Sequence, residues 1–138
     1  MGGEETNRFC WEVHLKALSV RQPWAQLIAQ GDKTIEVRNR PWSYRDQLVI
    51  CATARPIELD DDGEPLPVGC AVAIVDMVDC RPLRPDDAFP ACMDGDCGDF
   101  TSDECAGKWA WVLSGSRMVE NVPVKGQLQP WDWKGKPL

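Results

Sequence analysis

The sequence predicts an α+β fold, in which about six strands form a small mixed β-barrel with one or two short helices. The length of 138 residues is that of a single domain. Hydrophobic residues make up 43% of the chain and charged residues 27%, an ordinary globular composition. The segments between the predicted strands are too short for the crossover helices of repeated βαβ units. A barrel or a curled sheet is therefore the expected architecture.

Six segments carry apolar and β-branched residues at strand spacing. They are, in chain order, His14–Val20, Thr34–Arg38, Leu48–Ala54, Gly69–Val78, Lys108–Leu113 and Met118–Val124. Leu48–Ala54 and Gly69–Val78 are apolar almost throughout, which indicates strands that are buried on both faces. We expect a turn at Ser114–Ser116 between the last two strands, and Gln129–Trp133 closes the chain.

One helix is predicted between the first two strands. Pro23 suits a first helical turn, where its missing N–H is not needed. Trp24, Leu27 and Ile28 then form a single apolar stripe, and Gly31 ends the helix. Trp24 is thereby predicted to belong to the core.

The domain organisation follows from composition. Residues 1–13 are polar and acidic and are predicted to form a flexible tail, with one domain over residues 14–138. An acidic, loop-rich insertion is expected around residues 81–105, with a helical turn near Pro85–Phe89.

The net charge of −7 is unevenly distributed. Between Asp60 and Cys105 there are 13 acidic and two basic residues, whereas the rest of the chain has 13 basic and nine acidic residues. The flanks are therefore basic, so a nucleic-acid partner is compatible with the acidic average. The acidic segment itself suggests contact with a protein partner.

No segment is apolar over the roughly 18 residues that a transmembrane helix needs, so no membrane partner is expected. Seven cysteines without a secretion signal predict a reducing, cytoplasmic environment. Cys51 and Cys70 lie in apolar runs and are predicted to be buried.

The four cysteines in and near the acidic insertion are candidate zinc ligands. Zinc sites use a spacing of two to four residues within each pair of ligands. The gaps between Cys80, Cys92, Cys97 and Cys105 are 11, 4 and 7 residues, so only Cys92 and Cys97 approach this pattern. We therefore favour free thiols in a solvated acidic insertion and expect neither a metal nor another cofactor.

The candidate functional residues follow the predicted helix. Lys33, Glu36 and Arg38 fall around the strand Thr34–Arg38, and they either face water or line a polar cleft. Trp42 and Tyr44 follow with Arg45, and aromatic rings beside cations can stack on a base and hold its phosphate. The spacing alone slightly favours the simpler alternative, a solvated strand face with weak surface ion pairs.

Several blocks of sequence resemble the ASCH domain family, which belongs to the PUA-like superfamily. They are Leu18–Ala25, the pattern GxKxxExR from Gly31 to Arg38, Leu48–Ala54, Gly69–Cys70 with Val75–Cys80, and Pro123–Gly126 with Trp131. The resemblance implies a PUA-like barrel that binds RNA, single-stranded nucleic acid or a nucleotide in a cleft lined by GxKxxExR. It implies Lys33, Glu36 and Arg38 as cleft residues, with Gln22 and Trp24 in an entry motif and Lys125 and Trp131 in a closing one. The ligand-binding candidates are Gln22, Lys33, Glu36, Arg38, Lys125 and Trp131, to which we add Trp42, Tyr44 and Arg45 as stacking and phosphate-binding groups.

An enzyme is the alternative. Some members of the family resemble amidohydrolases of acetylcytidine that use a lysine, a threonine and an acid, and others resemble ribonucleases. Lys33 matches the lysine, but Glu36 stands where the threonine would be, and the acid would be Asp86 or Asp87. We expect Glu36 to raise the pKa of Lys33 and keep its amine protonated, which disfavours this chemistry.

A non-catalytic binding module is thus the preferred function. Because we expect Lys33 and Glu36 to be exposed, the substitutions Lys33→Ala and Glu36→Gln should weaken binding and leave the fold intact.

Overall fold

The computed structural model describes residues 15–95, 98–135 and 138. The predicted tail, His14 and Cys97 lie outside these residues. The elements are β1 (Lys16–Val20), α2 (Trp24–Ala29), β2 (Ile35–Arg38), β3 (Gln47–Ala52), β4 (Cys70–Pro82), the 3₁₀ turn η1 (Pro85–Asp87), α3 (Ser102–Cys105), β5 (Trp109–Met118) and β6 (Trp131–Asp132). Within this described part, no helix has the length and apolar character needed to cross a membrane.

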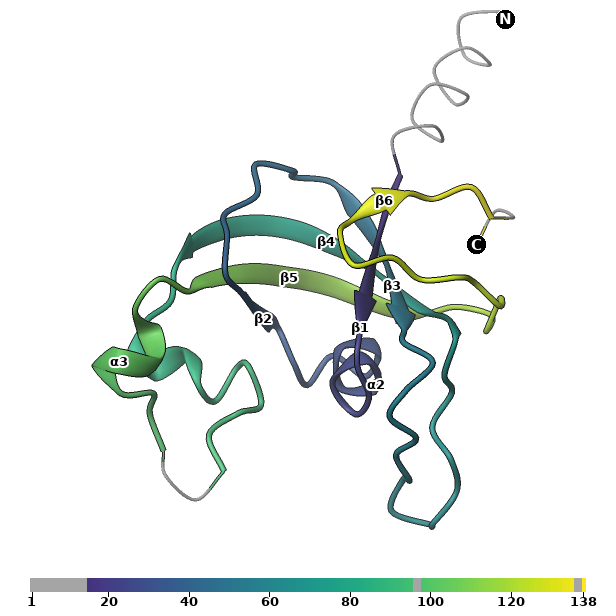
Figure 1. The fold of residues 1–138 in the computed structure, drawn as a ribbon, viewed down its shortest axis with the longest axis horizontal. Helices are drawn as coiled ribbons and strands as arrows, with labels where there is room; N and C mark the ends of the chain where they lie inside the picture. The colour runs from purple at the N-terminus through teal and green to yellow at the C-terminus, as the bar shows by residue number, and fades with distance from the viewer. Residues whose placement is uncertain (1–14, 96–97, 136–137) are drawn as a thin grey trace, which may run out of the picture.

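The six strands form one curled sheet in the order β2-β5-β4-β3-β1-β6 (Figure 1). β1 and β3 are parallel, and every other neighbouring pair is antiparallel. The pairing of β4 with β5 shifts register at two places, and such bulges bend a strand. The result is a half-barrel with two short helices, which confirms the predicted α+β fold.

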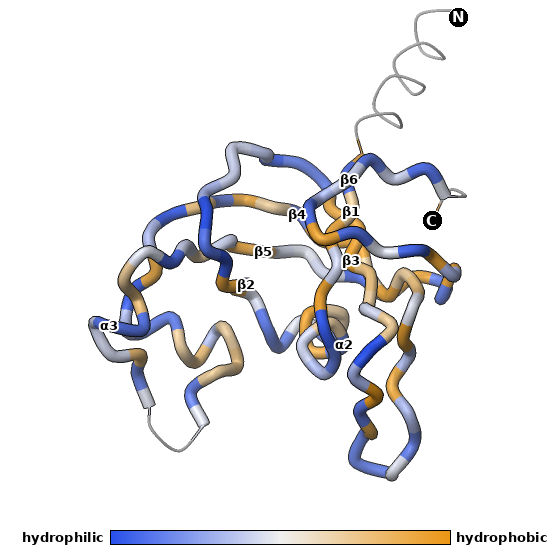
Figure 2. Tube along the Cα trace, in the orientation of Figure 1, coloured by the Kyte–Doolittle hydropathy of each residue, from blue (hydrophilic) through white to orange (hydrophobic). Residues whose placement is uncertain are grey.

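Both faces of β3, in the middle of the sheet, are buried. Leu48 and Ile50 of β3 join the core cluster that includes Ile28 of α2, whereas Val49 and Cys51 join a second cluster beneath the C-terminal segment. Figure 2 shows these hydrophobic strands meeting α2 on one side. Alternate residues of β3 point to opposite faces and pack into different clusters. The buried positions on both faces are therefore apolar, which explains the continuous apolar run in its sequence.

The predicted turn and sixth strand differ from the structure. β5 continues through Ser114–Ser116, where the register with β4 shifts, so these residues form a bulge instead of a turn. Gly115 has φ of 64°, and a Cβ at this position would lie 2.9 Å from Asp76 Oδ2. The segment predicted as a strand over Met118–Val124 lies mostly outside the sheet, and β6 is the sixth strand instead.

A buried acid organises the acidic segment. Asp87 accepts two hydrogen bonds from the Arg81 guanidinium, at 2.8 Å each, and another from the backbone N–H of Arg84. These bonds hold the pKa of Asp87 below its ordinary value. α3 follows, and a capping box formed by Thr101 and Glu104 fixes its first turn.

We expect Asp87→Ala to lower the free energy of unfolding by about 2 kcal/mol, which is below the roughly 3–5 kcal/mol of a fully buried pair because Arg81 is partly exposed. Since the pKa of Asp87 is lower in the folded state, its stabilisation is complete above the ordinary value and is lost as the pH falls through the folded value. Urea denaturation at neutral and acidic pH measures both effects. Asp86→Ala, at the exposed neighbour, is the matched control, and an equal loss there would contradict the assignment.

Candidate ligand-binding cleft

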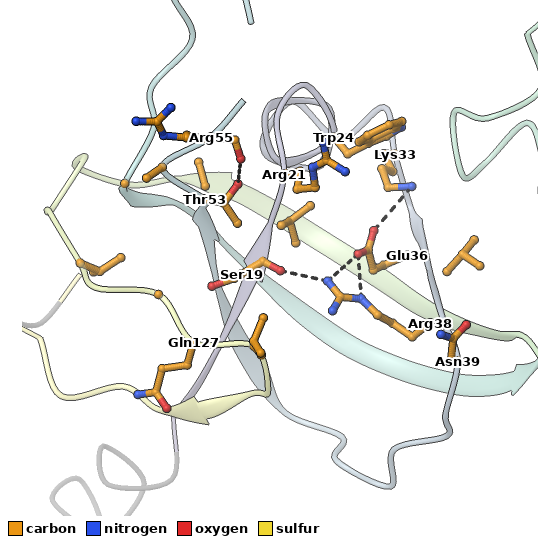
Figure 3. A pocket seen from close by; sticks show the side chains of 18 of the residues that line it. Ser19, Arg21, Trp24, Lys33, Glu36, Arg38, Asn39, Thr53, Arg55 and Gln127 are labelled. Carbon is orange, nitrogen blue, oxygen red and sulfur yellow. Dashed lines mark hydrogen bonds and ion pairs between the residues drawn. The ribbon is translucent and has the colours of Figure 1, made fainter. Parts of the chain in front are cut away.

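A cleft of about 1100 Å³ opens beside β2, where the ends of β1 and β3 meet the segment before β6 (Figure 3). This volume is slightly above the range of about 300–1,000 Å³ for ligand pockets. β1 contributes Ser19 and Val20, followed by Arg21, and β2 contributes Glu36 to Arg38. The opposite wall is formed by residues 52–55 and 124–128.

Lys33, Glu36 and Arg38 form a connected charged cluster in this cleft. The Arg38 guanidinium donates to Glu36 Oε2 from Nε at 2.9 Å and from Nη2 at 2.7 Å, and Nη2 also donates to the Ser19 carbonyl at 2.9 Å. Lys33 Nζ lies 3.7 Å from Glu36 Oε1 and donates to the Ala91 carbonyl at 2.6 Å. The side chain of Arg38 is 26% exposed, so it is the member of this cluster that a ligand can reach most easily.

The expectation that Lys33 and Glu36 are exposed is wrong. Lys33 is 2% exposed and Glu36 is 9% exposed. The alternation of the strand correctly placed Glu36 and Arg38 on one face, but this face is the buried wall of a cleft. Their ion pairs are therefore partly dehydrated contacts and not the weak surface pairs that the spacing alone favoured.

The pKa of Lys33 lies below its ordinary value. Burial disfavours the charged amine, and this effect outweighs the opposite influence of the Glu36 carboxylate. The sequence-based expectation had the sign wrong, because it considered the neighbouring charge without the burial.

Four further cations line the cleft, namely Arg21, Arg55, Lys108 and Lys125. Among the residues that the structure describes, none of their side chains has an ion-pair partner. With Lys33 and Arg38 the cleft has six basic side chains and one acidic one, Glu36, in a chain of net charge −7. The arrangement is suited to an anionic ligand.

Trp24 is the aromatic residue of the cleft wall. It is half-buried, packs partly against the core cluster and lines the cleft together with Lys33 (Figure 3). The core assignment from the helical stripe is therefore correct but incomplete, because Trp24 also borders the cleft.

Trp42, Tyr44 and Arg45 lie outside this cleft. The two rings stack on each other with centroids 4.7 Å apart, and Trp42 also packs against Trp111 at 5.2 Å. Arg45 donates to the carbonyls of Trp42 and Tyr44. They belong to the loop after β2, of which Asn39 lines the cleft. The structure therefore does not bring these three residues into one cleft with Lys33, Glu36 and Arg38.

Gln22 and Trp131 have structural contacts. The Gln22 side chain is 1% exposed, donates to the Pro67 carbonyl and accepts from the Gln26 N–H, which fixes the start of α2. Trp131 packs against the second core cluster. Lys125, in contrast, is exposed and lines the cleft as the sequence suggested.

The other candidate residues lie apart. Asp87 is committed to Arg81, and neither Asp86 nor Asp87 lines the cleft, so neither is placed to serve Lys33 as a catalytic acid. Cys51 and Cys70 are buried as predicted, and burial raises the pKa of Cys51 to about 12. Over residues 15–95 and 98–135, no group of three or more His, Cys, Asp or Glu side chains is placed to hold a metal ion. Cys80, Cys92 and Cys105 are free thiols, and Cys97 is outside the described residues.

A family model of the ASCH domain matches residues 18–96, more than half of the chain. The chain belongs to the ASCH domain family. This ASCH domain is 29% identical to human activating signal cointegrator 1 and 28% identical to the mouse protein over 141 aligned residues. Each alignment covers 86% of the chain and 22% of the relative, so the chain spans about a fifth of the length of these proteins.

Solved structures of ASCH proteins have the same fold. The ASCH protein of Zymomonas mobilis superposes with a TM-score of 0.55 at 16% identity, covering 87% of this chain and 88% of that one. One variant of that protein gives a TM-score of 0.58 at 15% identity and covers 87% of this chain. A second variant gives a TM-score of 0.59 at 14% identity and covers 89% of this chain, and each superposition covers 91% of the variant.

Proposed function

We propose that this ASCH domain binds a phosphate-bearing, single-stranded nucleic acid or nucleotide in the cleft, with RNA as the preferred class. The observation that carries the proposal is the charge of the cleft, with six basic side chains and one acidic side chain in an otherwise acidic chain. Such a local field attracts a polyanion even when the net charge of the protein is negative.

The side chains suggest a division of roles. Arg38 is fixed by Glu36 and by the Ser19 carbonyl, so its orientation is set before a ligand arrives. Arg21, Arg55 and Lys125 are exposed and free to meet phosphates. Trp24 offers an indole surface on which a base can stack.

We expect the double variant Arg21→Glu, Lys125→Glu to bind a short oligouridine at least tenfold more weakly than the parent, because two phosphate contacts become repulsive. The single variant Arg117→Glu is the matched control, since Arg117 is an exposed arginine outside the cleft. Fluorescence anisotropy with a labelled oligonucleotide measures the affinities.

The salt dependence of the same titration tests the geometry. The four basic side chains without ion pairs predict a slope of log affinity against log salt of about −3 for a single strand. A slope that requires six or more phosphate contacts, or equal weakening by Arg117→Glu, would contradict the cleft as the binding site.

An amidohydrolase is the second candidate, and the lowered pKa of the buried Lys33 favours it. A lysine needs such a lowered pKa to act as a base or nucleophile. Against it, Lys33 Nζ is engaged by the Ala91 carbonyl, and its side chain is 1% exposed. Glu36 also stands where the resemblance to acetylcytidine hydrolases places a hydroxyl.

We therefore expect the parent protein to hydrolyse little or no acetylcytidine. The measurement is release of acetate from acetylcytidine by the parent, by Glu36→Thr and by Lys33→Ala. Turnover by the parent that Lys33→Ala abolishes would contradict the binding-module function. Turnover by Glu36→Thr alone would show that this side chain blocks the reaction.

A further inference from the structure

A second, smaller pocket adjoins the cleft. It has a volume of about 260 Å³ and is lined by Lys16, Arg40, Pro41, Trp42, Gln129 and Pro130. The two chain segments that line the cleft near Asn39 and Leu128 also line this small pocket. Asn39 and Leu128 line the cleft, and the next residues in the chain, Arg40 and Gln129, line the small pocket.

This continuity places the two cavities side by side. Consecutive Cα atoms are about 3.8 Å apart, so residues that line the two cavities are direct neighbours at the Asn39–Arg40 step and again at the Leu128–Gln129 step. All four residues are exposed. The same two chain segments therefore border both cavities, and we call the exposed strip formed by these four residues the shared rim.

The lining of the small pocket suits a planar base with its phosphate. Pro41, Pro130 and Trp42 supply rigid apolar surface, and Trp42 is held in place by its stacking on Tyr44. The Gln129 amide can hydrogen-bond to the edge of a base. At about 260 Å³ the pocket is slightly below the range for drug-sized ligands, which fits one small planar group better than a second large molecule.

Arg40 supplies the charge. Lys16 is already paired with Asp132 at 2.5 Å. The Arg40 side chain is exposed and has no hydrogen-bond or ion-pair partner within the described part of the chain, although its carbonyl accepts from Trp111 Nε1. The backbone of Arg40 is thus anchored while its guanidinium stays available for a phosphate.

We infer that the small pocket is a second nucleotide subsite, which receives the base next to the one in the cleft while Arg40 contacts the intervening phosphate. The inference rests on the proposed function and deepens it, because it makes the ligand an oligonucleotide of at least two residues that runs across the shared rim. Trp42, which was expected to stack in the main cleft, then serves the neighbouring position.

The test compares uridine monophosphate with oligouridines of two, three and four residues on the full chain. We expect the affinity to rise on going from one to two residues. We further expect Arg40→Ala to remove this rise, to weaken the dinucleotide about tenfold and to leave the mononucleotide unaffected, because it removes one charged contact. Its salt slope for the dinucleotide should fall by about 0.7. Gln129→Ala tests the base contact, and Arg117→Ala is the control.

The outcomes separate the inference from the proposed function. If the dinucleotide binds no more tightly than the mononucleotide, or if Arg40→Ala weakens both equally, the subsite is wrong and the cleft remains. If no nucleotide or oligonucleotide of RNA or DNA binds at all, both fail. Thermal unfolding of Arg40→Ala shows whether weaker binding comes from a loss of folded protein. We expect its unfolding midpoint to match that of Arg117→Ala, since both side chains are exposed.

Discussion

Arg38→Lys is expected to weaken oligonucleotide binding by about tenfold, although it keeps the positive charge. The guanidinium of Arg38 uses two nitrogens on Glu36 and one of these also on the Ser19 carbonyl. A lysine amine cannot reproduce this fork, so the charge would remain but its position would not be fixed. Anisotropy titration of an oligouridine measures the loss.

The matched control for this substitution is Arg21→Lys. Arg21 also lines the cleft, but it is exposed and has no ion pair among the described residues, so only its charge should matter. We expect Arg21→Lys to bind nearly as well as the parent. Equal effects of the two substitutions would mean that the fixed orientation of Arg38 has no part in binding.

Glu36→Gln is expected to lower the free energy of unfolding by about 2 kcal/mol, because a partly buried ion pair loses one member, whereas breaking a fully buried pair costs roughly 3–5 kcal/mol. Lys33 and Arg38 would then face each other across a neutral side chain, with Lys33 almost fully buried. Urea denaturation gives the value. The result would differ from the initial expectation that this substitution leaves the fold unaffected.

Glu64→Gln is the control, since Glu64 is exposed and has no ion pair within the described residues. A double-mutant cycle with Arg38→Met isolates the coupling between Glu36 and Arg38. We expect the double variant to lose less stability than the sum of the two single variants. Additive losses would rule out the coupling.

Local sequence patterns predicted an element correctly where the residues of that element alone determine its structure. The apolar runs identified β3 and β4, and the stripe from Trp24 to Ile28 identified α2. The error at Ser114–Ser116 has a physical cause, because a glycine between serines suits both a turn and a bulge. Only the pairing with β4, from a distant part of the chain, decides between them.

The site was predictable in part for the same reason. Lys33, Glu36 and Arg38 lie within six residues and could be grouped from their spacing, with support from the family resemblance. Their burial could not be predicted from the local sequence, since it depends on Ala91 and on the rest of the fold around β2. Arg55 and Lys108 reach the cleft from other parts of the chain, and nothing in their local sequence marks them as members of the site.

The pairing of β1 with β6 brings the two ends of the fold together. Lys16 at the start of β1 lies opposite Asp132 in β6, and their side chains form an ion pair. The polypeptide therefore enters and leaves the half-barrel at one point on its edge (Figure 1). Domains whose ends meet in this way tolerate insertion into a host loop and circular permutation, because neither requires the fold to open. A permuted chain that joins residue 133 to residue 16 through a short linker, with new ends in the exposed turn at Asp61–Gly63, should keep both the sheet and the cleft.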